Sequence, residues 1–329
     1  MKIMVTGASG YIGHKLVQQL AAQGHKVHAL VRSGAAGKLL QHPLVTLFVG
    51  DVLEKHTLLP ALEGCQQVYH TAAKVGAWDQ NPQVFYDVNV GGTQHVLEAA
   101  ASAGVQRLVF TSTAGVLGPA EEAPVTEDHH RTLPFQIDYD RSKKEAEDLV
   151  KAYAANGLSA VIVSPAKVYG PGHTSHSLTA NAIIRSFLRK GVAFIPAPGT
   201  YRVCFAYVDD VVQGHLQAMA NGTSGETYLL GGNNVSYADF FGCIRQLSGS
   251  KGKIIALSQS VIKAAASAQE FAHRAVGTNI RFPVQSVDHL FSNYIFSSDK
   301  AVEHLGYHIT PLEEALSSTI QFLKRNKHA

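Results

Sequence analysis

The sequence has few cysteines, and the three that it has stand far apart. Cys65, Cys204 and Cys243 form no CxxC pair, so neither a disulfide framework nor a zinc site is indicated. No HExxH motif occurs either. The nearest pattern, His173-Thr-Ser-His176, stands in a loop rich in glycine, proline and serine, without companion ligands. We therefore expect no metal site.

Long apolar runs and a strong charge of one sign are also missing. No stretch of about 18 apolar residues occurs, and an expected strand begins at Lys2, so we expect neither a membrane span nor a signal peptide. The net charge is only +3, which does not indicate a nucleic-acid partner. Because 46% of the 329 residues are hydrophobic and only 16% are charged, the chain is expected to be a globular, cytoplasmic protein.

What the first half does contain is an alternation of short β-branched runs and helical patterns. Near-continuous apolar strands separated by crossover helices are typical of a parallel sheet covered on both faces. The sequence therefore predicts an α/β protein with a Rossmann-type doubly wound parallel sheet. Strands are predicted at 2–5, 26–31, 44–49, 67–71, 106–111 and 159–164, and helices at about 11–23, 55–63, 83–103 and 139–156.

The second half changes character. Proline and glycine cluster in it, and helices are predicted at about 177–190, 209–221, 236–248, 258–275 and 311–325, the last with Thr310 as its N-cap. We predict a Rossmann domain over residues 1–165 and a smaller, mostly helical substrate domain over 166–329. Residues from about 201 to 232 are expected to return to the Rossmann sheet.

A glycine-rich turn, TGASGYIG, joins the first strand to the first helix. Glycines there allow a tight turn and a close approach of the backbone to a pyrophosphate, and the helix N-terminus offers N–H groups to the phosphates. The spacing is GxxGxxG rather than the commoner GxGxxG. The strand–turn–helix context predicts dinucleotide binding, with contacts from Thr6, Gly7, Ser9, Gly10, Tyr11, Ile12 and Gly13.

Basic residues follow the second strand, where an NAD enzyme usually has an acidic one. Arg32, Ser33 and Lys38 stand there. A guanidinium can hold a 2′-phosphate, whereas a carboxylate would repel it, so we predict NADP(H) as cofactor, with NAD(H) as the alternative. The other interpretation is a solvated arginine at a strand end. Asp51, after the third strand, is placed to contact the adenine edge, or is simply a turn aspartate.

Tyr139 and Lys143 open a predicted helix four residues apart, so they share one face of it. A nearby ammonium favours the phenolate and is expected to lower the tyrosine pKa from its reference of about 10. Tyr11 and Lys15 have the same spacing, but Tyr139 follows the fifth strand, on the side where parallel sheets bind ligands. Thr113, just past that strand, has a hydroxyl that could bind a carbonyl oxygen, although threonine is also common at strand ends.

Together these motifs resemble the extended short-chain dehydrogenase/reductase family, or NAD-dependent epimerase/dehydratase family, over nearly the whole chain. Within the family, the segments VRS, TSTAGVLGP and YDRSKKEAE resemble the dihydroflavonol 4-reductase branch. The resemblance also rests on Gly50-Asp51-Val52, His70-Thr71-Ala72-Ala73, Asn89-Val-Gly-Gly-Thr93, Pro165-Ala-Lys-Val-Tyr-Gly-Pro-Gly172, Tyr207-Val-Asp-Asp210 and Phe296-Ser-Ser-Asp-Lys300-Ala301.

The resemblance implies NADPH-dependent reduction of a small carbonyl compound. Tyr139 would be the acid, Lys143 its partner and a ribose ligand, and Thr113 the hydroxyl that orients the carbonyl. Further cofactor contacts are implied at Asp51, Val52, Thr71, Ala72, Ala73, Pro165 and Val168.

Two other functions stay open. One is an NAD-dependent sugar epimerase or 3β-hydroxysteroid-type dehydrogenase, and the other is a non-catalytic NADP-sensing scaffold, although such scaffolds tend to lose the tyrosine. Sugar dehydration is not expected, because Ala114-Gly115 replaces the family's Asp-Glu pair. The substrate site is expected between loops 74–81, 114–137 and 166–180 and the region 258–292, with Trp78 as a lid or packed on its own domain. A monomer and a homodimer are both compatible with the sequence.

Overall fold

The computed structural model describes residues 1–35, 38–172, 180–276 and 283–326. Its main sheet has seven strands, all parallel, in the order β10-β6-β5-β4-β1-β2-β3. This confirms the predicted doubly wound sheet. The strands are β1 (Lys2–Thr6), β2 (Lys26–Val31), β3 (Val45–Val49), β4 (Gln67–His70), β5 (Arg107–Thr111), β6 (Ala160–Pro165) and β10 (Thr227–Leu230).

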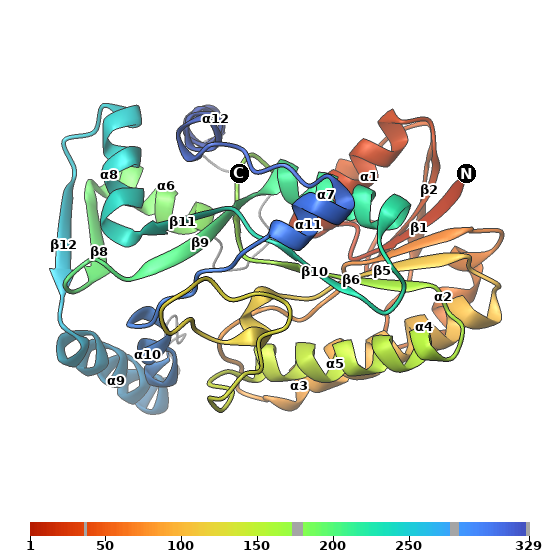
Figure 1. Ribbon diagram of the computed structural model, residues 1–329, viewed down its shortest axis with the longest axis horizontal. Coiled ribbons are helices and arrows are strands. Elements are labelled where there is room, and N and C mark those ends of the chain that lie inside the picture. The colour runs from red at the N-terminus through yellow and green to blue at the C-terminus, as the bar shows by residue number, and fades with distance from the viewer. Residues whose placement is uncertain (36–37, 173–179, 277–282, 327–329) are drawn as a thin grey trace.

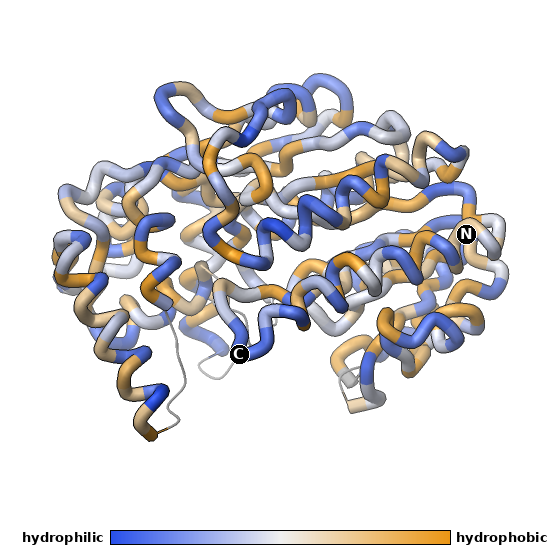
Figure 2. The backbone as a smooth tube through the Cα atoms, turned by 90° about the horizontal axis from the view of Figure 1, so that it is seen from below, coloured by the Kyte–Doolittle hydropathy of each residue, from blue (hydrophilic) through white to orange (hydrophobic). Residues whose placement is uncertain are grey.

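Helices cover both faces of this sheet (Figure 1). On one face lie α1 (Tyr11–Ala22), α7 (Val208–Asn221) and α11 (Asp299–Leu305), over a core that includes Leu16, Val211 and Leu305. On the other lie α2 (Lys55–Leu62), α3 (Gln83–Tyr86), α4 (Gly92–Ser102) and α5 (Asp138–Ala155). Blue and orange alternate along the helices of this lower face, as expected for helices with one buried side (Figure 2).

The predicted helix over 83–103 is one helical segment with an irregular middle. A π-helical turn at Asp87–Gly91 separates α3 from α4. Such turns insert an extra residue into the helix and are common at functional sites. This one places Asn89 inside the protein.

The second half contains strands that the sequence did not predict. A three-stranded sheet has the order β11-β9-β7, and β8 pairs with β12. They are β7 (Lys167–Tyr169), β8 (Val192–Pro196), β9 (Arg202–Tyr207), β11 (Asn233–Ser236) and β12 (Lys253–Leu257). The described part of the second half is still mostly helical, as expected. These strands could not be predicted because they are short and pair with strands far along the chain.

Besides α7 and α11, the described helices of this half are α6 (Ala180–Lys190), α8 (Tyr237–Ser248), α9 (Gln259–Val276), α10 (Val287–Leu290) and α12 (Leu312–Arg325). They pack with the small sheets at one end of the molecule (Figure 1). Strand β10 pairs with β6 in the main sheet. It lies within residues 201–232, the range expected to return to that sheet. The division into two domains stays a prediction. No helix among the described residues is long and apolar enough to cross a membrane.

Thr310 does not cap the last helix. Its hydroxyl donates to Asp210 Oδ1 over 2.6 Å, and its backbone N–H donates to Asp210 Oδ2 over 2.7 Å. These bonds tie Thr310 to α7. Helix α12 starts after Pro311, which is its N-cap residue, and no side chain caps the first turn. The prediction of an N-cap at Thr310 was therefore wrong.

Candidate active site

The glycine turn after β1 is packed too closely for side chains. A Cβ atom at Gly7, whose φ is +64°, would lie 2.6 Å from the nitrogen of Ala72, and one at Gly13 would lie 2.3 Å from the oxygen of Gly7. Helix α1 begins at Tyr11, and its N-cap, Gly10, has no side chain to occupy the first N–H groups. The turn thus has the bare backbone and helix N-terminus that suit a pyrophosphate.

The other residues predicted in this turn have different surroundings. Ser9 is exposed, whereas Ile12 packs against the core on the α1 side of the sheet. The phenol of Tyr11 donates to the oxygen of Gly170 over 2.6 Å and accepts from Asn181 Nδ2 over 3.1 Å. The Tyr11 side chain thus joins the glycine turn to the loop after β7. That these residues contact a cofactor stays a prediction.

The residues predicted to select the cofactor lie at the end of β2. Arg32 and Ser33 are exposed there, and the side chain of Lys38 is outside the described part of the chain. Asp51 Oδ1 accepts from the N–H of Leu53 over 3.0 Å, as a turn aspartate does. The adenine contact of Asp51 and the NADP preference both stay predictions.

The remaining predicted cofactor contacts lie at or near the carboxyl edge of the sheet. Thr71 donates to the oxygen of Thr6 over 2.7 Å, and the N–H of Ala72 donates to the hydroxyl of Thr6 over 3.2 Å. These bonds hold the segment after β4 against the glycine turn. Val52 is buried, Ala73 is half-buried, Pro165 ends β6, and Val168 packs against the α1-side core.

Tyr139 lies in the first turn of α5, and the structure brings it to Thr113. A side-chain hydrogen bond joins the phenol to the Thr113 hydroxyl. Burial is the main cause that raises the pKa of Tyr139, the Asp140 carboxylate raises it further, and the bond to Thr113 lowers it. The prediction that Lys143 lowers this pKa was therefore wrong for the protein as described: the phenol keeps its proton.

Lys143 is fully buried one turn further along α5. Its Nζ lies 4.0 Å from the centroid of the Phe110 ring and has no hydrogen-bond partner among the described residues. Burial lowers the pKa of Lys143 to about 7, against a smaller effect of Glu147 that raises it. A buried ammonium without a partner fits the ribose hydroxyls of a dinucleotide, which would accept its hydrogen bonds.

Asp140 is a charged residue of the site that the sequence did not single out. Its carboxylate packs against Gly115, where a Cβ atom would lie 2.4 Å from Oδ1. Burial raises the pKa of Asp140 to about 7, and the positive charge of Arg131 lowers it. Asp140 follows Tyr139 directly, but its burial depends on Gly115, which is distant in sequence.

A buried chain of hydrogen bonds connects the glycine turn to α5. Thr93 donates to the oxygen of Asn89 over 2.6 Å, so its single proton is used, and His70 Nε2, at 3.0 Å, must donate to Thr93. His70 Nδ1 then accepts from Thr6 over 2.7 Å. Burial, together with the charge of Lys143, lowers the pKa of His70 to about 3, which agrees with a neutral ring.

The same chain continues from Asn89 into α5. Asn89 Nδ2 donates to the Ser142 hydroxyl over 2.9 Å, and that hydroxyl donates to the oxygen of Tyr139 over 2.8 Å. Asn89 also exchanges two hydrogen bonds with the backbone of Lys74. Polar residues within the predicted helix, four positions apart at Asn89 and Thr93, were the sequence signal for this network.

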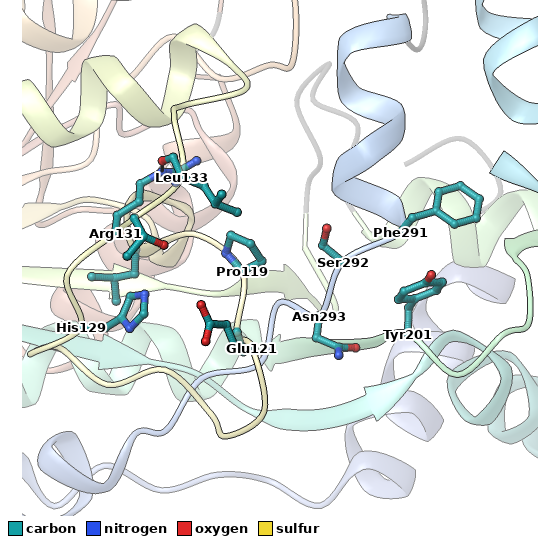
Figure 3. A pocket seen from close by; sticks show the side chains of 12 residues that line it. Pro119, Glu121, His129, Arg131, Leu133, Tyr201, Phe291, Ser292 and Asn293 are labelled. Carbon is teal, nitrogen blue, oxygen red and sulfur yellow. Dashed lines mark hydrogen bonds between the residues drawn. The ribbon is translucent and has the colours of Figure 1, made fainter. Parts of the chain in front are cut away.

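A cavity of about 260 Å³ lies between the loop that follows Thr113 and the second half of the chain (Figure 3). Pro119, Arg131 and Leu133 lie on one side of it, and Tyr201 and Phe291 lie on the other. The Nη1 of Arg131 donates to the oxygen of Gly115 over 2.9 Å, which joins the cavity wall to the turn after Thr113. Loop 114–137 and the end of the region 258–292 border this cavity, whereas the described residues of loops 74–81 and 166–180 do not line it. That it binds the substrate stays a prediction.

Trp78 contacts the second half of the chain. Its ring meets that of His273 in α9 edge to face, with the centroids 5.5 Å apart, and it lines a second cavity of about 270 Å³ with Glu270 and Arg274. A lid function of Trp78 stays a prediction. The pattern at His173 and His176 lies outside the described residues.

Comparison with known proteins identifies the family. The family model "NAD dependent epimerase/dehydratase family" matches residues 3–231. Sterol demethylase protein B of Methylococcus capsulatus is 36% identical over 251 residues, 76% of this chain and 75% of that protein. A putative dihydroflavonol 4-reductase of Synechocystis sp. is 28% identical over 98% of this chain and 94% of that protein. The solved structure of MoeE5 with UDP-glucose and NAD has a TM-score of 0.78 and 26% identity, over 99% of this chain and 100% of that one.

The chain belongs to the NAD-dependent epimerase/dehydratase family, and it is an enzyme of the extended short-chain dehydrogenase/reductase type. This confirms the family that the motifs resemble. The roles of the individual residues, which the comparisons do not test, are part of the proposal that follows.

Proposed function

We propose that the protein is an NADPH-dependent reductase that converts the carbonyl of a small aldehyde or ketone to an alcohol. The observation that carries the proposal is the arrangement around Tyr139. Its phenol keeps its proton, is hydrogen-bonded to Thr113, and stands one turn from the unpartnered ammonium of Lys143. A protonated phenol is the form that a reductase needs for its acid.

A nicotinamide dinucleotide fits the residues that are present. The close-packed glycine turn suits the pyrophosphate, and Lys143 suits the ribose. MoeE5, similar in fold and in sequence, was solved with NAD, which supports this class of cofactor. We propose NADPH in particular because the exposed Arg32 at the end of β2 can pair with a 2′-phosphate.

The bound cofactor supplies a hydride to the carbonyl carbon. The Thr113 hydroxyl holds the carbonyl oxygen, and the O–H bond of Tyr139 breaks as its proton passes to that oxygen. With the Thr113 proton directed to the substrate oxygen, the Lys143 ammonium, one turn along α5, is the positive charge of the site that would favour the phenolate left on Tyr139. The product is an alcohol, and Tyr139 regains its proton from solvent.

The test is a panel of aldehydes and ketones given to the purified protein with NADPH or NADH, followed by nicotinamide absorbance. We expect NADPH oxidation with at least one carbonyl compound, and turnover about 10²–10⁴ times slower with the Tyr139→Phe variant. Interconversion of a sugar nucleotide without net NADPH oxidation would indicate an epimerase instead. Activity that the Tyr139→Phe variant retains in full would contradict the proposed chemistry.

A further inference from the structure

We propose that the substrate of this reductase carries a carboxylate, and that Lys167 binds it beside the reacting carbonyl. The inference rests on the proposed reduction and names the class of substrate: an oxo acid with an apolar body.

Lys167 lies at the edge of the main sheet where Thr113 lies. In the pairing of β5 with β6, Thr111 stands opposite Val163. Thr113 follows its strand by two residues, and Lys167 stands four residues past Val163, so both segments leave the same edge of the sheet. Lys167 is also the first residue of β7, which holds its backbone in the three-stranded sheet.

The register of β9 fixes the direction of the Lys167 side chain. Lys167 stands opposite Phe205, and Tyr294 stands opposite Val203, two positions earlier on the same strand. Because side chains alternate along a strand, Val203 and Phe205 share a face, and their partners Lys167 and Tyr294 project from that face too.

An aromatic ring lies near the Lys167 ammonium on this face. Its Nζ lies 5.9 Å from the centroid of the Tyr237 ring. His289, whose ring centroid lies 3.8 Å from that of Tyr294, is close enough for the Lys167 charge to act on it. The lysine is half-buried, so an anion paired with it is partly shielded from water and held more strongly than on the surface.

No acidic side chain among the described residues forms an ion pair with Lys167. His289 supplies no charge of either sign, because burial and the positive charges of Lys167 and Arg131 lower its pKa to about 3. Asp140 is the carboxyl group near Arg131, and its raised pKa of about 7 leaves it half-neutral at neutral pH. Arg131 thus has the carboxyl groups of Asp140 and, in the cavity wall, Glu121 near it, whereas Lys167 has no ion-paired carboxylate among the described residues, and one substrate carboxylate would supply it.

The neighbouring cavity suits the rest of such a substrate. Its wall includes Leu117, Pro119, Leu133 and Phe291, which offer apolar surface, and the charged side chains of Arg131 and Glu121. Arg131 joins the wall to the Gly115 turn. The apolar part of the wall suits a hydrocarbon body, and the Lys167 ammonium outside it suits one negative charge. A nucleoside diphosphate would bring at least two charges and a polar sugar.

The experiment compares 4-oxopentanoate and 6-oxoheptanoate with their methyl esters, using NADPH and the full chain. We expect kcat/KM to be at least about tenfold higher for one of the acids than for its ester, mainly through KM, which corresponds to about 1.4 kcal/mol. In Lys167→Met this preference disappears, while activity on the ester is kept. Lys26→Met, which removes the same charge from an exposed position at the opposite edge of the sheet, keeps the preference.

Equal kcat/KM for acid and ester in the parent protein, or a preference that persists in Lys167→Met, would overturn the inference and leave the reductase intact. If no carbonyl compound is reduced, the proposed function fails, and calorimetric titration of the NADP-loaded protein with both acids decides the inference. Binding that is lost in Lys167→Met and kept in Lys26→Met supports the carboxylate site. Equal binding by all three proteins, or no binding by the parent, overturns it.

Discussion

The side-chain amide of Asn89 donates to the hydroxyl of Ser142 over 2.9 Å, inside the protein. The bond joins the π-helical turn between α3 and α4 to the helix that carries Tyr139. Because the Ser142 hydroxyl also bonds the oxygen of Tyr139, Asn89 helps to fix the first turn of α5. It acts on the reaction through the position of Tyr139.

Asn89→Ala should therefore weaken both folding and turnover. The variant leaves the backbone of Lys74 without its partners, and a buried polar group left unpaired costs about 1–3 kcal/mol. We expect a lower denaturation midpoint and a lower kcat, with cofactor affinity less affected. Gln94→Ala, which removes an exposed amide from α4, should change neither. An Asn89→Ala protein with the parent's midpoint would contradict the role of this network.

Tyr139→Phe should reduce turnover by about 10²–10⁴, the usual contribution of a positioned acid. The glycine turn and Arg32 do not depend on this hydroxyl, so NADPH affinity should stay close to that of the parent. The two measurements are NADPH titration and absorbance kinetics on the same preparation. Thr113→Ser keeps a hydroxyl and should be mild, whereas Thr113→Val should be severe.

Lys143→Met should abolish turnover and yet stabilise the fold. Burial lowers the pKa of Lys143 to about 7, from an ordinary value of 10.5, so the unfolded chain binds the proton more tightly. The lysine therefore destabilises the protein fully below about pH 7, and this cost disappears as the pH rises to about 10.5. We expect the free energy of unfolding of the variant to exceed that of the parent by about 1–4 kcal/mol near pH 7.

The check is denaturant unfolding of parent and Lys143→Met at pH 6, 8 and 10. The gain should shrink steadily over this range. A gain that is constant with pH would mean that packing, rather than the buried charge, separates the two proteins.

Gly115→Ala should be destabilising, because its Cβ atom would lie 2.4 Å from Asp140 Oδ1. The carboxylate next to Tyr139 must move, so we expect kcat to fall together with the denaturation midpoint. Gly242→Ala is the matched control: no atom lies within 4 Å of its Cβ position, inside α8, and it should stabilise the protein by about 0.5–1 kcal/mol. Equal effects of the two substitutions would contradict the packing of Asp140 on Gly115.

Arg32→Ala should weaken NADPH binding about ten- to a hundredfold and leave NADH binding nearly unchanged. The reason is the loss of a charge-assisted hydrogen bond, worth about 1.5–3 kcal/mol, to the 2′-phosphate. The change in affinity is measured by titrating the parent and the Arg32→Ala variant with NADPH and with NADH. Equal affinities of the parent for NADPH and NADH would remove the basis of the NADP assignment.

Six of the seven strands of the main sheet could be predicted because each is a short apolar run bounded by turns, as in residues 26–31. The strands of the second half could not be predicted in this way. Lys167–Tyr169 has three residues, and its pairing depends on β9, which lies almost 40 residues further along the chain. A strand this short has no periodicity, so its structure follows from tertiary contacts alone.

The site shows the same limit in its electrostatics. The pair Tyr139 and Lys143 could be found from spacing and position, but the direction of the Tyr139 pKa could not. That direction depends on burial and on Asp140, whose own burial comes from packing on Gly115. Likewise, nothing local in the sequence indicates that Asn89 bonds Ser142, because the two are brought together by helix packing.

The bond from Tyr11 to Gly170 has a kinetic consequence. One phenol, with Asn181, holds the glycine turn and the loop after β7 together, so the segment proposed to bind the nucleotide and a segment expected beside the substrate share an anchor. A ligand that orders the turn at Tyr11 also orders the chain near Gly170, before any carbonyl compound arrives. Turnover should then follow a compulsory order, in which the nucleotide binds first and leaves last. The oxidised nucleotide should inhibit competitively with respect to the reduced nucleotide and not with respect to the carbonyl compound.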